Sequence, residues 1–308
     1  MNMTVAVLIP CYNEEAAIGA VVRDFRAALP EARIYVYDNN STDRTRERAA
    51  EAGATVRVET RKGKGHVVCR MFADVDADAY VLVDGDDTYD AASAPGMVEM
   101  LRSQQLDLVT GVRVTGSQGA FRPGHVLGNR LLTGLVASLF ENRFSDMLSG
   151  YRVFSRRFVK SFPALVSGFE IETAFTIHAL ELRMPCAEVS TPYKDRPAGS
   201  ASKLRTYHDG FRILLTILRL LLEVRPLALL GTCSLLSAIT SISVAIPVFI
   251  TYAETGLVPR LPTAVLAASL MLLAFLCLAT GLILDLVTLG RREAKRLAYL
   301  SIPAPRLD

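Results

Sequence analysis

The segment Tyr80-Val81-Leu82-Val83-Asp84-Gly85-Asp86-Asp87-Thr88 decides how the rest of the chain is interpreted. Its apolar half has the length of a buried parallel strand, and three carboxylates follow within four residues. Carboxylates this close repel one another unless a cation or hydrogen-bond donors offset their charge, and oxygen ligands suit Mg²⁺ or Mn²⁺. Gly85 lets the backbone turn sharply and approach a ligand closely. The segment alone is compatible with a metal site at Asp84 and Asp86, and equally with a solvated acidic turn.

Strands and helices alternate through the first part of the chain. The predicted strands cover residues 4–9 (ended by Pro10), 34–37, 55–58, 80–83 and 108–112. This alternation predicts an α/β fold with a mainly parallel sheet covered on both faces. In such sheets ligands gather at the carboxyl ends of the strands. Polar residues follow three of these strands, namely Tyr12, Glu14, Asp38, Asp84 and Asp86. One shared binding site explains all of them.

Composition restricts the classes of function. The chain has 308 residues, and its formal net charge of +3 is too small to indicate a nucleic-acid partner. No basic stripe is interleaved with aromatic residues either, so we expect no nucleic acid. The five cysteines are scattered without a Cys-x-x-Cys pair, which is typical of reduced thiols in a protein that faces the cytosol.

The charge pattern changes in the last third of the chain. Residues 207–225 carry a narrow polar stripe on an otherwise apolar helix, which predicts an amphipathic helix in a membrane interface. Pro226–Ala253 and Leu261–Leu284 contain no charged residue, and at about 1.5 Å per residue each exceeds the ~30 Å hydrocarbon thickness of a bilayer. We therefore expect transmembrane helices at about 227–252 and 261–285.

Basic residues flank both ends of this hairpin. They are Arg212, Arg219 and Arg225 before it, and Arg291, Arg292, Lys295 and Arg296 after it. The positive-inside rule then puts both flanks on the cytoplasmic face of the cytoplasmic membrane, together with the domain that precedes them. The predicted organisation is a catalytic domain at 1–206, an interfacial helix at 207–225, a transmembrane hairpin at 226–290 and a cytoplasmic tail at 291–308.

Six motifs give the chain a family resemblance. In order they are Ile9-Pro10-Cys11-Tyr12-Asn13-Glu14-Glu15, Tyr37-Asp38-Asn39-Asn40-Ser41-Thr42-Asp43, Gly63-Lys64-Gly65, Asp84-Gly85-Asp86, Ser149-Gly150-Tyr151-Arg152 and the segment from Arg196 to Lys203. They resemble the family 2 glycosyltransferases, and the last two narrow the resemblance to polyprenyl-phosphate hexose synthases of the dolichol-phosphate mannose synthase type. Cys11, Asn39, Asn40 and Thr88 depart from the residues usual in the family, which leaves the nucleotide and a third metal contact open.

The resemblance implies a GT-A fold and an inverting transfer of a hexose from a UDP- or GDP-sugar to the phosphate of undecaprenyl or dolichyl phosphate. It implies that Asp84 and Asp86 hold Mg²⁺ or Mn²⁺, that Asp86, Arg113 and Arg130 are catalytic, and that the two arginines grip the acceptor phosphate. The residues implied for nucleotide-sugar binding are Pro10, Tyr12, Glu14, Asp38, Lys64, Asp84, Gly85, Arg196 and Lys203. Members of this shape also form homo-oligomers, so a tetramer is compatible with the sequence.

The chemistry of the residues agrees with this interpretation. A phosphate oxygen is already ionised near neutral pH, so the reaction needs no dedicated general base, whereas the leaving diphosphate needs its charge neutralised. A processive polysaccharide synthase is disfavoured because its Gln-x-x-Arg-Trp motif requires a tryptophan, which this chain lacks. A catalytically inactive scaffold that binds a nucleotide sugar stays open, as does a transferase with another lipid or glycan acceptor. The intact pair of Asp84 and Asp86 argues against inactivity.

Overall fold

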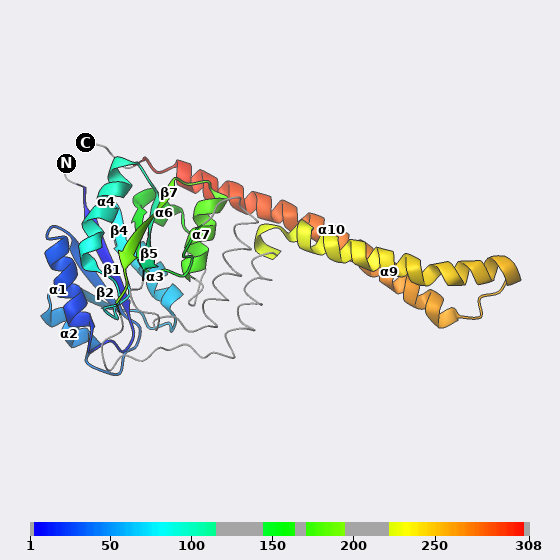
Figure 1. The fold of residues 1–308 in the computed structure, drawn as a ribbon, viewed down its shortest axis with the longest axis horizontal. Coiled ribbons are helices and arrows are strands. Elements are labelled where there is room, and N and C mark those ends of the chain that lie inside the picture. Colours follow the sequence, from blue (N-terminus) through cyan, green and yellow to red (C-terminus); the bar gives the residue numbers. More distant parts are fainter. Residues whose placement is uncertain (1–2, 115–143, 164–170, 195–221, 305–308) are drawn as a thin grey trace. The chain divides into compact units, whose positions relative to one another are not determined.

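The protein folds around one mixed sheet. The computed structural model describes residues 3–114, 144–163, 171–194 and 222–304. Within these residues seven strands lie in the order β3-β2-β1-β4-β6-β5-β7 (Figure 1). The strands are β1 Val5–Cys11, β2 Arg33–Asp38, β3 Thr55–Val58, β4 Ala79–Leu82, β5 Leu108–Val114, β6 Arg152–Ser155 and β7 Cys186–Pro192. Only β6 runs antiparallel to its neighbours among these strands, so the mainly parallel sheet expected from the sequence is confirmed.

Helices follow most of the strands in the chain (Figure 1). Those of the sheet-containing part are α1 Ile18–Ala28, α2 Thr45–Glu51, α3 Lys64–Asp74, the 3-10 turn η1 Ala91–Ser93, α4 Ala94–Ser103, α6 Arg156–Ser161 and α7 Ile171–Glu181. Side chains alternate across the sheet. Val81 of β4 joins an aliphatic cluster with Val22 of α1 and Met97 of α4. Its neighbour Tyr80 instead meets Phe72 of α3, with ring centroids 6.3 Å apart.

Pro10 lies inside β1, although the sequence predicts that the strand ends before it. The strand pairs with β2 through Cys11 but with β4 only through Leu8. The last hydrogen bond towards β4 runs from Val83 N to Leu8 O at 3.1 Å. Residues two apart in a strand direct their N–H groups to the same side, so the N–H that Pro10 lacks would face the side where pairing has already ended.

Two compact units divide the chain. One comprises Met1–Ile213 together with Lys295–Asp308, and the other comprises Leu214–Ala294. The second unit holds α9, Pro226–Thr255, and most of α10, Leu261–Leu300. Both helices are long and apolar enough to cross a membrane, by length and composition. The core helices of a soluble domain are mostly buried, whereas only 11% of the apolar window of each helix is buried here.

Small polar side chains join α9 to α10. Ser234 Oγ donates to the backbone oxygen of Ala274 at 2.8 Å, and Ser241 Oγ donates to that of Ala267 at 2.7 Å. The second contact lies later in α9 but earlier in α10 than the first, so the two helices run antiparallel and form a hairpin. Hydrogen bonds of this kind stabilise helix pairs in a bilayer, where apolar contacts give no preference for protein over lipid.

Helix α10 does not end near residue 285, where the apolar sequence ends. It continues through Leu300, so the first residues of the predicted tail, from 291 on, are helical. The predicted helix at 125–140 lies outside the described residues. So does the predicted interfacial helix, apart from the helical residues 222–224 and Arg225.

The last turns of α10 belong to the same unit as the sheet. The Tyr299 hydroxyl donates to Oδ2 of Asp107 at 2.9 Å, while Ser155 Oγ and Arg157 Nε donate to Oδ1 at 2.6 and 2.5 Å. Asp107 is fully buried, and these hydrogen bonds offset the cost of removing its charge from water. The Arg157 guanidinium also lies over the Tyr299 ring, 4.9 Å from its centroid.

Replacing Tyr299 by Phe should lower the free energy of unfolding by about 2 kcal/mol, because a buried carboxylate loses one of its hydrogen-bond donors. The ring and its contact with Arg157 are kept. Thermal unfolding of the full chain in detergent micelles measures the change, with Tyr252→Phe at an exposed position of α9 as the control. Equal unfolding temperatures for the two variants would contradict this contribution.

Candidate active site

Asn39 ties the carboxyl ends of β1 and β2 to the glycine loop before α3. Its backbone N donates to Cys11 O at 2.8 Å, and its side-chain oxygen accepts a hydrogen bond from Gly63 N at 2.7 Å. Its amide nitrogen donates to the backbone oxygens of Glu59 and Arg61 at 2.9 and 2.8 Å. The residue that departs from the family pattern therefore holds three segments of the strand-end edge in place.

Lys64, the first residue of α3, reaches the acidic loop after β4. Its Nζ lies 2.5 Å from Asp84 Oδ1 and 2.5 Å from Glu172 Oε1. The side chains of Lys64, Asp84 and Glu172 are 12%, 29% and 7% exposed, so the ammonium bridges a partly exposed and a buried carboxylate. Burial alone would lower the pKa of Lys64, but the attraction of Asp84 and Glu172 outweighs it and raises that pKa above its ordinary value. Lys64 is thus a fixed cation of the site.

Gly150 and Gly85 allow close packing around the Asp84 loop, because neither residue has a Cβ atom that would clash there. A Cβ on Gly150 would lie 2.9 Å from Asp84 Cγ and closer still to one carboxylate oxygen. A Cβ on Gly85 would lie 2.6 Å from the Cys11 sulfur. Gly150 N also donates to the buried hydroxyl of Tyr89 at 2.9 Å, which fixes the backbone of this glycine against the loop.

Gly150→Ala should displace the Asp84 carboxylate and lower kcat by about 10²-fold, because a shift of about 1 Å in a binding group can cost that much in rate. Thermal unfolding should change little, because the clash falls on the end of one side chain. Gly96→Ala in α4 is the matched control, since a Cβ there meets nothing within 4 Å. Turnover of Gly150→Ala at the control's level would contradict the close approach.

Asp86 lies deeper in the same loop and is 4% exposed. Its Oδ1 accepts hydrogen bonds from Thr88 Oγ1 at 2.6 Å and from Thr88 N at 3.4 Å. Thr88, whose departure from the family pattern had left a third metal contact open, therefore orients the Asp86 carboxylate.

The site fits a divalent cation that is held partly by substrate. Asp84 and Asp86 offer carboxylate oxygens, the ligands that Mg²⁺ and Mn²⁺ prefer. Across the described residues, no three His, Cys, Asp or Glu side chains gather as they would in a site made of protein ligands alone. One or two carboxylates completed by substrate phosphates is the usual arrangement for Mg²⁺.

Arg113, near the end of β5, forms a bidentate ion pair. Its Nε and Nη2 donate to the two oxygens of Asp146 at 2.7 and 2.8 Å, and the two side chains are 16% and 8% exposed. Its guanidinium carbon lies 5.6 Å from the centroid of the Tyr193 ring. Asp146 and Tyr193 thus fix the guanidinium plane, and any phosphate that binds Arg113 has to share it with Asp146.

Three of the residues expected to bind the nucleotide sugar, Pro10, Tyr12 and Asp38, lie at the ends of β1 and β2. Asp38 is fully buried, and its two oxygens accept hydrogen bonds from Ser41 N at 3.3 and 3.1 Å. Tyr12 is 40% exposed just after β1, and Pro10 is one residue from the end of that strand. The structure therefore groups these residues on one edge, with the Asp38 carboxylate engaged by its own loop.

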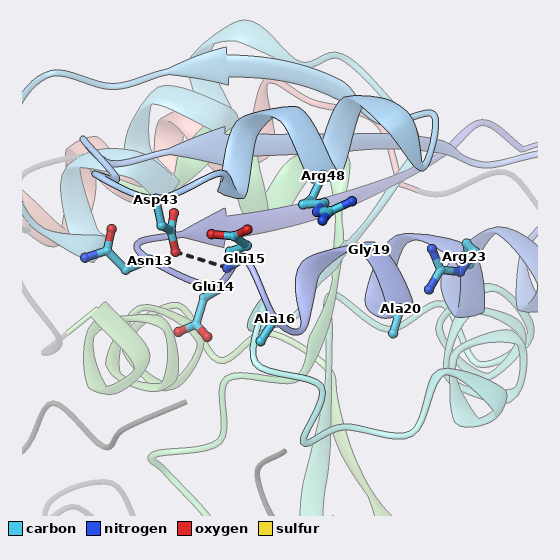
Figure 2. Close-up of a pocket in the computed structure, with 9 residues that line it drawn as sticks. All are labelled: Asn13, Glu14, Glu15, Ala16, Gly19, Ala20, Arg23, Asp43 and Arg48. Atoms are coloured by element: carbon cyan, nitrogen blue, oxygen red, sulfur yellow. Dashed lines mark hydrogen bonds between the residues drawn. The ribbon is translucent and has the colours of Figure 1, made fainter. Parts of the chain in front are cut away.

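A pocket of about 620 Å³ lies on the helix side of the loop after β1 (Figure 2). Its lining residues are Asn13, Glu14, Glu15, Ala16, Gly19, Ala20, Arg23, Asp43 and Arg48. Glu15 N donates to Asp43 Oδ2 at 3.2 Å, and in Figure 2 the Glu14 carboxylate points away from that pair. Glu14 is the single predicted site residue in this lining, so the pocket is not the site around Asp84.

Three predicted site residues, Arg130, Arg196 and Lys203, lie outside the described residues. Conversely, the structure brings in Glu172 and Asp146, to which the sequence analysis gave no role. Glu172 had one usable signal, because it is a carboxylate in the first turn of the largely buried helix α7 and such a charge requires a partner. Asp146 had none, since its partner is 33 residues away in the sequence.

Comparisons with known proteins agree with this architecture. A family model described as glycosyl transferase family 2 matches residues 6–162. Glycosyltransferase AglJ from Haloferax volcanii is 32% identical over 299 residues, which cover 96% of this chain and 98% of AglJ. The dolichyl-phosphate hexose transferase of the same organism is 28% identical over 220 residues, which cover 71% of this chain and 95% of that protein.

One solved structure shows the same kind of fold. It is glucosyl-3-phosphoglycerate synthase from Mycobacterium tuberculosis, crystallised with Mn²⁺, uridine-diphosphate-glucose and phosphoglyceric acid. It is 26% identical to this chain, with a TM-score of 0.53, and the match covers 64% of this chain and 73% of that one.

Proposed function

The chain belongs to glycosyl transferase family 2 and is a glycosyltransferase, and we propose that it transfers a hexose from a nucleotide sugar to the phosphate of a polyprenyl phosphate lipid. One observation carries the proposal: a single chain combines a charged site at the strand ends with a hairpin of exposed apolar helices. A polyprenyl chain resides in the bilayer, so an enzyme that uses it benefits from a membrane anchor. The name of the dolichyl-phosphate hexose transferase supports this acceptor class.

The donor proposed is a UDP-sugar, with a GDP-sugar as the alternative. Support comes from the glucosyl-3-phosphoglycerate synthase that binds uridine-diphosphate-glucose with Mn²⁺. Asp84 and Asp86 would hold Mg²⁺ or Mn²⁺, which when bound supplies Lewis-acid stabilisation of the departing diphosphate. Pro10, Tyr12 and Asp38 would form the nucleotide end, and the roles of Glu14, Gly85, Arg196 and Lys203 stay predictions.

The residues of the chain would bind and orient rather than exchange protons. The Lys64 ammonium holds Asp84 in place from within the fold. Arg113, held in its orientation by Asp146, would bind the acceptor phosphate, and Arg130 stays a prediction for the same role. The acceptor oxygen is ionised near neutral pH, so no side chain has to remove a proton from it. Catalysis in this scheme is positioning together with charge stabilisation.

We also propose that α9 and α10 both cross the cytoplasmic membrane, with the transferase unit on the cytoplasmic side. The basic residues Arg291 and Arg292 stand in α10 just after its apolar part, and Arg225 precedes α9. The positive-inside rule gives these flanks the cytoplasmic side. Homo-oligomerisation, including a tetramer, is part of the same proposal and rests on the resemblance to hairpin-anchored members.

A transfer assay tests the function. The full chain in detergent micelles is incubated with Mn²⁺, a panel of radiolabelled UDP- and GDP-hexoses and one acceptor at a time: undecaprenyl phosphate, dolichyl phosphate or the water-soluble phosphoglyceric acid. The label is counted in the organic phase and in the soluble products. We expect one donor to label the lipid, with Asp86→Asn giving background counts. If no donor of the panel labels any lipid phosphate, the proposal is wrong. Transfer to a water-soluble acceptor alone would give the chain a different acceptor class.

A further inference from the structure

We propose that Glu172 is a positioning residue of the transfer site, which holds the Lys64 ammonium while restoring the negative charge that this ammonium removes from the Asp84 loop. The inference rests on the proposed function in one respect, that Asp84 and Asp86 serve the cation of the donor diphosphate. It adds a carboxylate on α7 to a site that is otherwise built from the strand ends.

The geometry links two helices to one loop. Lys64 begins α3, Glu172 stands in the first turn of α7, and Asp84 follows β4. The ammonium lies 2.5 Å from one oxygen of each carboxylate. Glu172 is 7% exposed, which is far more buried than Asp84 at 29%. Asp84 is therefore the carboxylate that a bound ligand can reach, whereas Glu172 holds the ammonium from within the fold.

Counting formal charges shows what Glu172 contributes. Lys64 and Asp84 alone form a pair with no net charge, and such a pair attracts a divalent cation weakly. With Glu172 the three groups carry a net charge of −1, and Asp86 in the same loop adds a further carboxylate. Glu172 therefore lets the fold keep a tethered lysine beside Asp84 without cancelling the field that favours Mg²⁺ or Mn²⁺.

The competing explanation is that Glu172 only fastens α7 to α3. The chain offers a matched comparison for this on the same helix. Glu181 of α7 is 6% exposed, and its Oε2 lies 2.6 Å from Lys295 Nζ. This second pair has the same chemistry and similar burial, but neither partner contacts the Asp84 loop through this ion pair.

The experiment compares Glu172→Gln with Glu181→Gln in the full chain in detergent micelles. The probe is Mn²⁺ together with UDP, whose diphosphate supplies the oxygens that complete the site. The bound ion is measured by electron paramagnetic resonance against Mn²⁺ and UDP without protein, and thermal unfolding is recorded for both variants. We expect Glu172→Gln to bind Mn²⁺ about tenfold more weakly or worse, the usual cost of losing an outer-shell partner of a metal site. Glu181→Gln should lose comparable thermal stability and keep the Mn²⁺ affinity of the wild type.

A conservative variant separates charge from shape. Glu172→Asp keeps the negative charge on a shorter side chain, so it should retain most of the Mn²⁺ affinity and also serves if Glu172→Gln does not fold. Equal Mn²⁺ affinity in the wild type and Glu172→Gln would overturn the inference. An equal loss of Mn²⁺ affinity in Glu172→Asp and Glu172→Gln would do the same, and so would a wild type that binds no Mn²⁺. The measurement uses neither a hexose nor a lipid, so failure of transfer to a lipid phosphate would leave its result unaffected.

Discussion

Asp86→Asn is expected to abolish hexose transfer in a protein that still folds, with kcat lower by about 10³-fold or more. Asp86 is 4% exposed, and its Oδ1 accepts the hydrogen bond from Thr88 Oγ1 at 2.6 Å. Asparagine has the same size and keeps an oxygen that can accept this bond, but it carries no charge. The variant therefore removes the carboxylate proposed to serve the metal while leaving the local hydrogen bonding in place.

Turnover and thermal unfolding in detergent micelles check this prediction together. Asp76→Asn is the control, because the Asp76 side chain is 65% exposed and pairs with Arg156 at the surface. Both variants should unfold near the wild-type temperature, and only Asp86→Asn should be inactive. Substantial transfer by Asp86→Asn would remove the metal role from this residue.

Lys64→Met should have the largest effect on stability, lowering the free energy of unfolding by about 3–5 kcal/mol, the range for breaking a buried ion pair from one side. Asp84 and Glu172 would then face each other without the cation that now lies 2.5 Å from each. Their repulsion should also move Asp84 away from its position, so transfer should fall to background. Chemical unfolding and turnover of the purified full chain measure the two effects.

A double variant identifies the cause of the lost stability. Lys64→Met combined with Glu172→Gln removes the repulsion between the two carboxylates, so it should be more stable than Lys64→Met alone and remain inactive. If the double variant is no more stable than the single one, charge repulsion is not the reason. If Lys64→Met is as stable as the wild type, the buried ammonium contributes nothing to the fold.

Much of the fold could be predicted because the chain repeats short local patterns. Apolar runs of strand length followed by amphipathic helices indicated the parallel strands β1 to β4 correctly, and with them the edge that brings Asp38, Lys64 and Asp84 together. The two apolar helices could be predicted equally well, because their length and their lack of charged residues can be read from each segment alone. The family and the GT-A-like fold expected from the motifs are confirmed by the match at residues 6–162 and by the solved structure.

The pairs that complete the site could not be predicted, because they join distant parts of the chain. Lys64 and Glu172 are 108 residues apart, and Arg113 and Asp146 are 33 apart. A single sequence carries no local signal for such pairings. The prediction that β1 ends before Pro10 was wrong for a related reason. A proline ends a strand only where its missing N–H faces a neighbouring strand, and that depends on how far β4 extends.

The contact between Tyr299 and Asp107 imposes an order on how the protein is made. Synthesis proceeds from the N-terminus, so a nascent chain exposes the residues of the sheet long before those of the final helical turns. The contacts of Asp107 with Tyr299 and of Glu181 with Lys295 can form only after both apolar helices have been translated. The unit made of Met1–Ile213 and Lys295–Asp308 thus reaches its final stability only after the hairpin has been synthesised. A fragment that ends at Ile213 would lack the stabilising contacts of Lys295 and Tyr299.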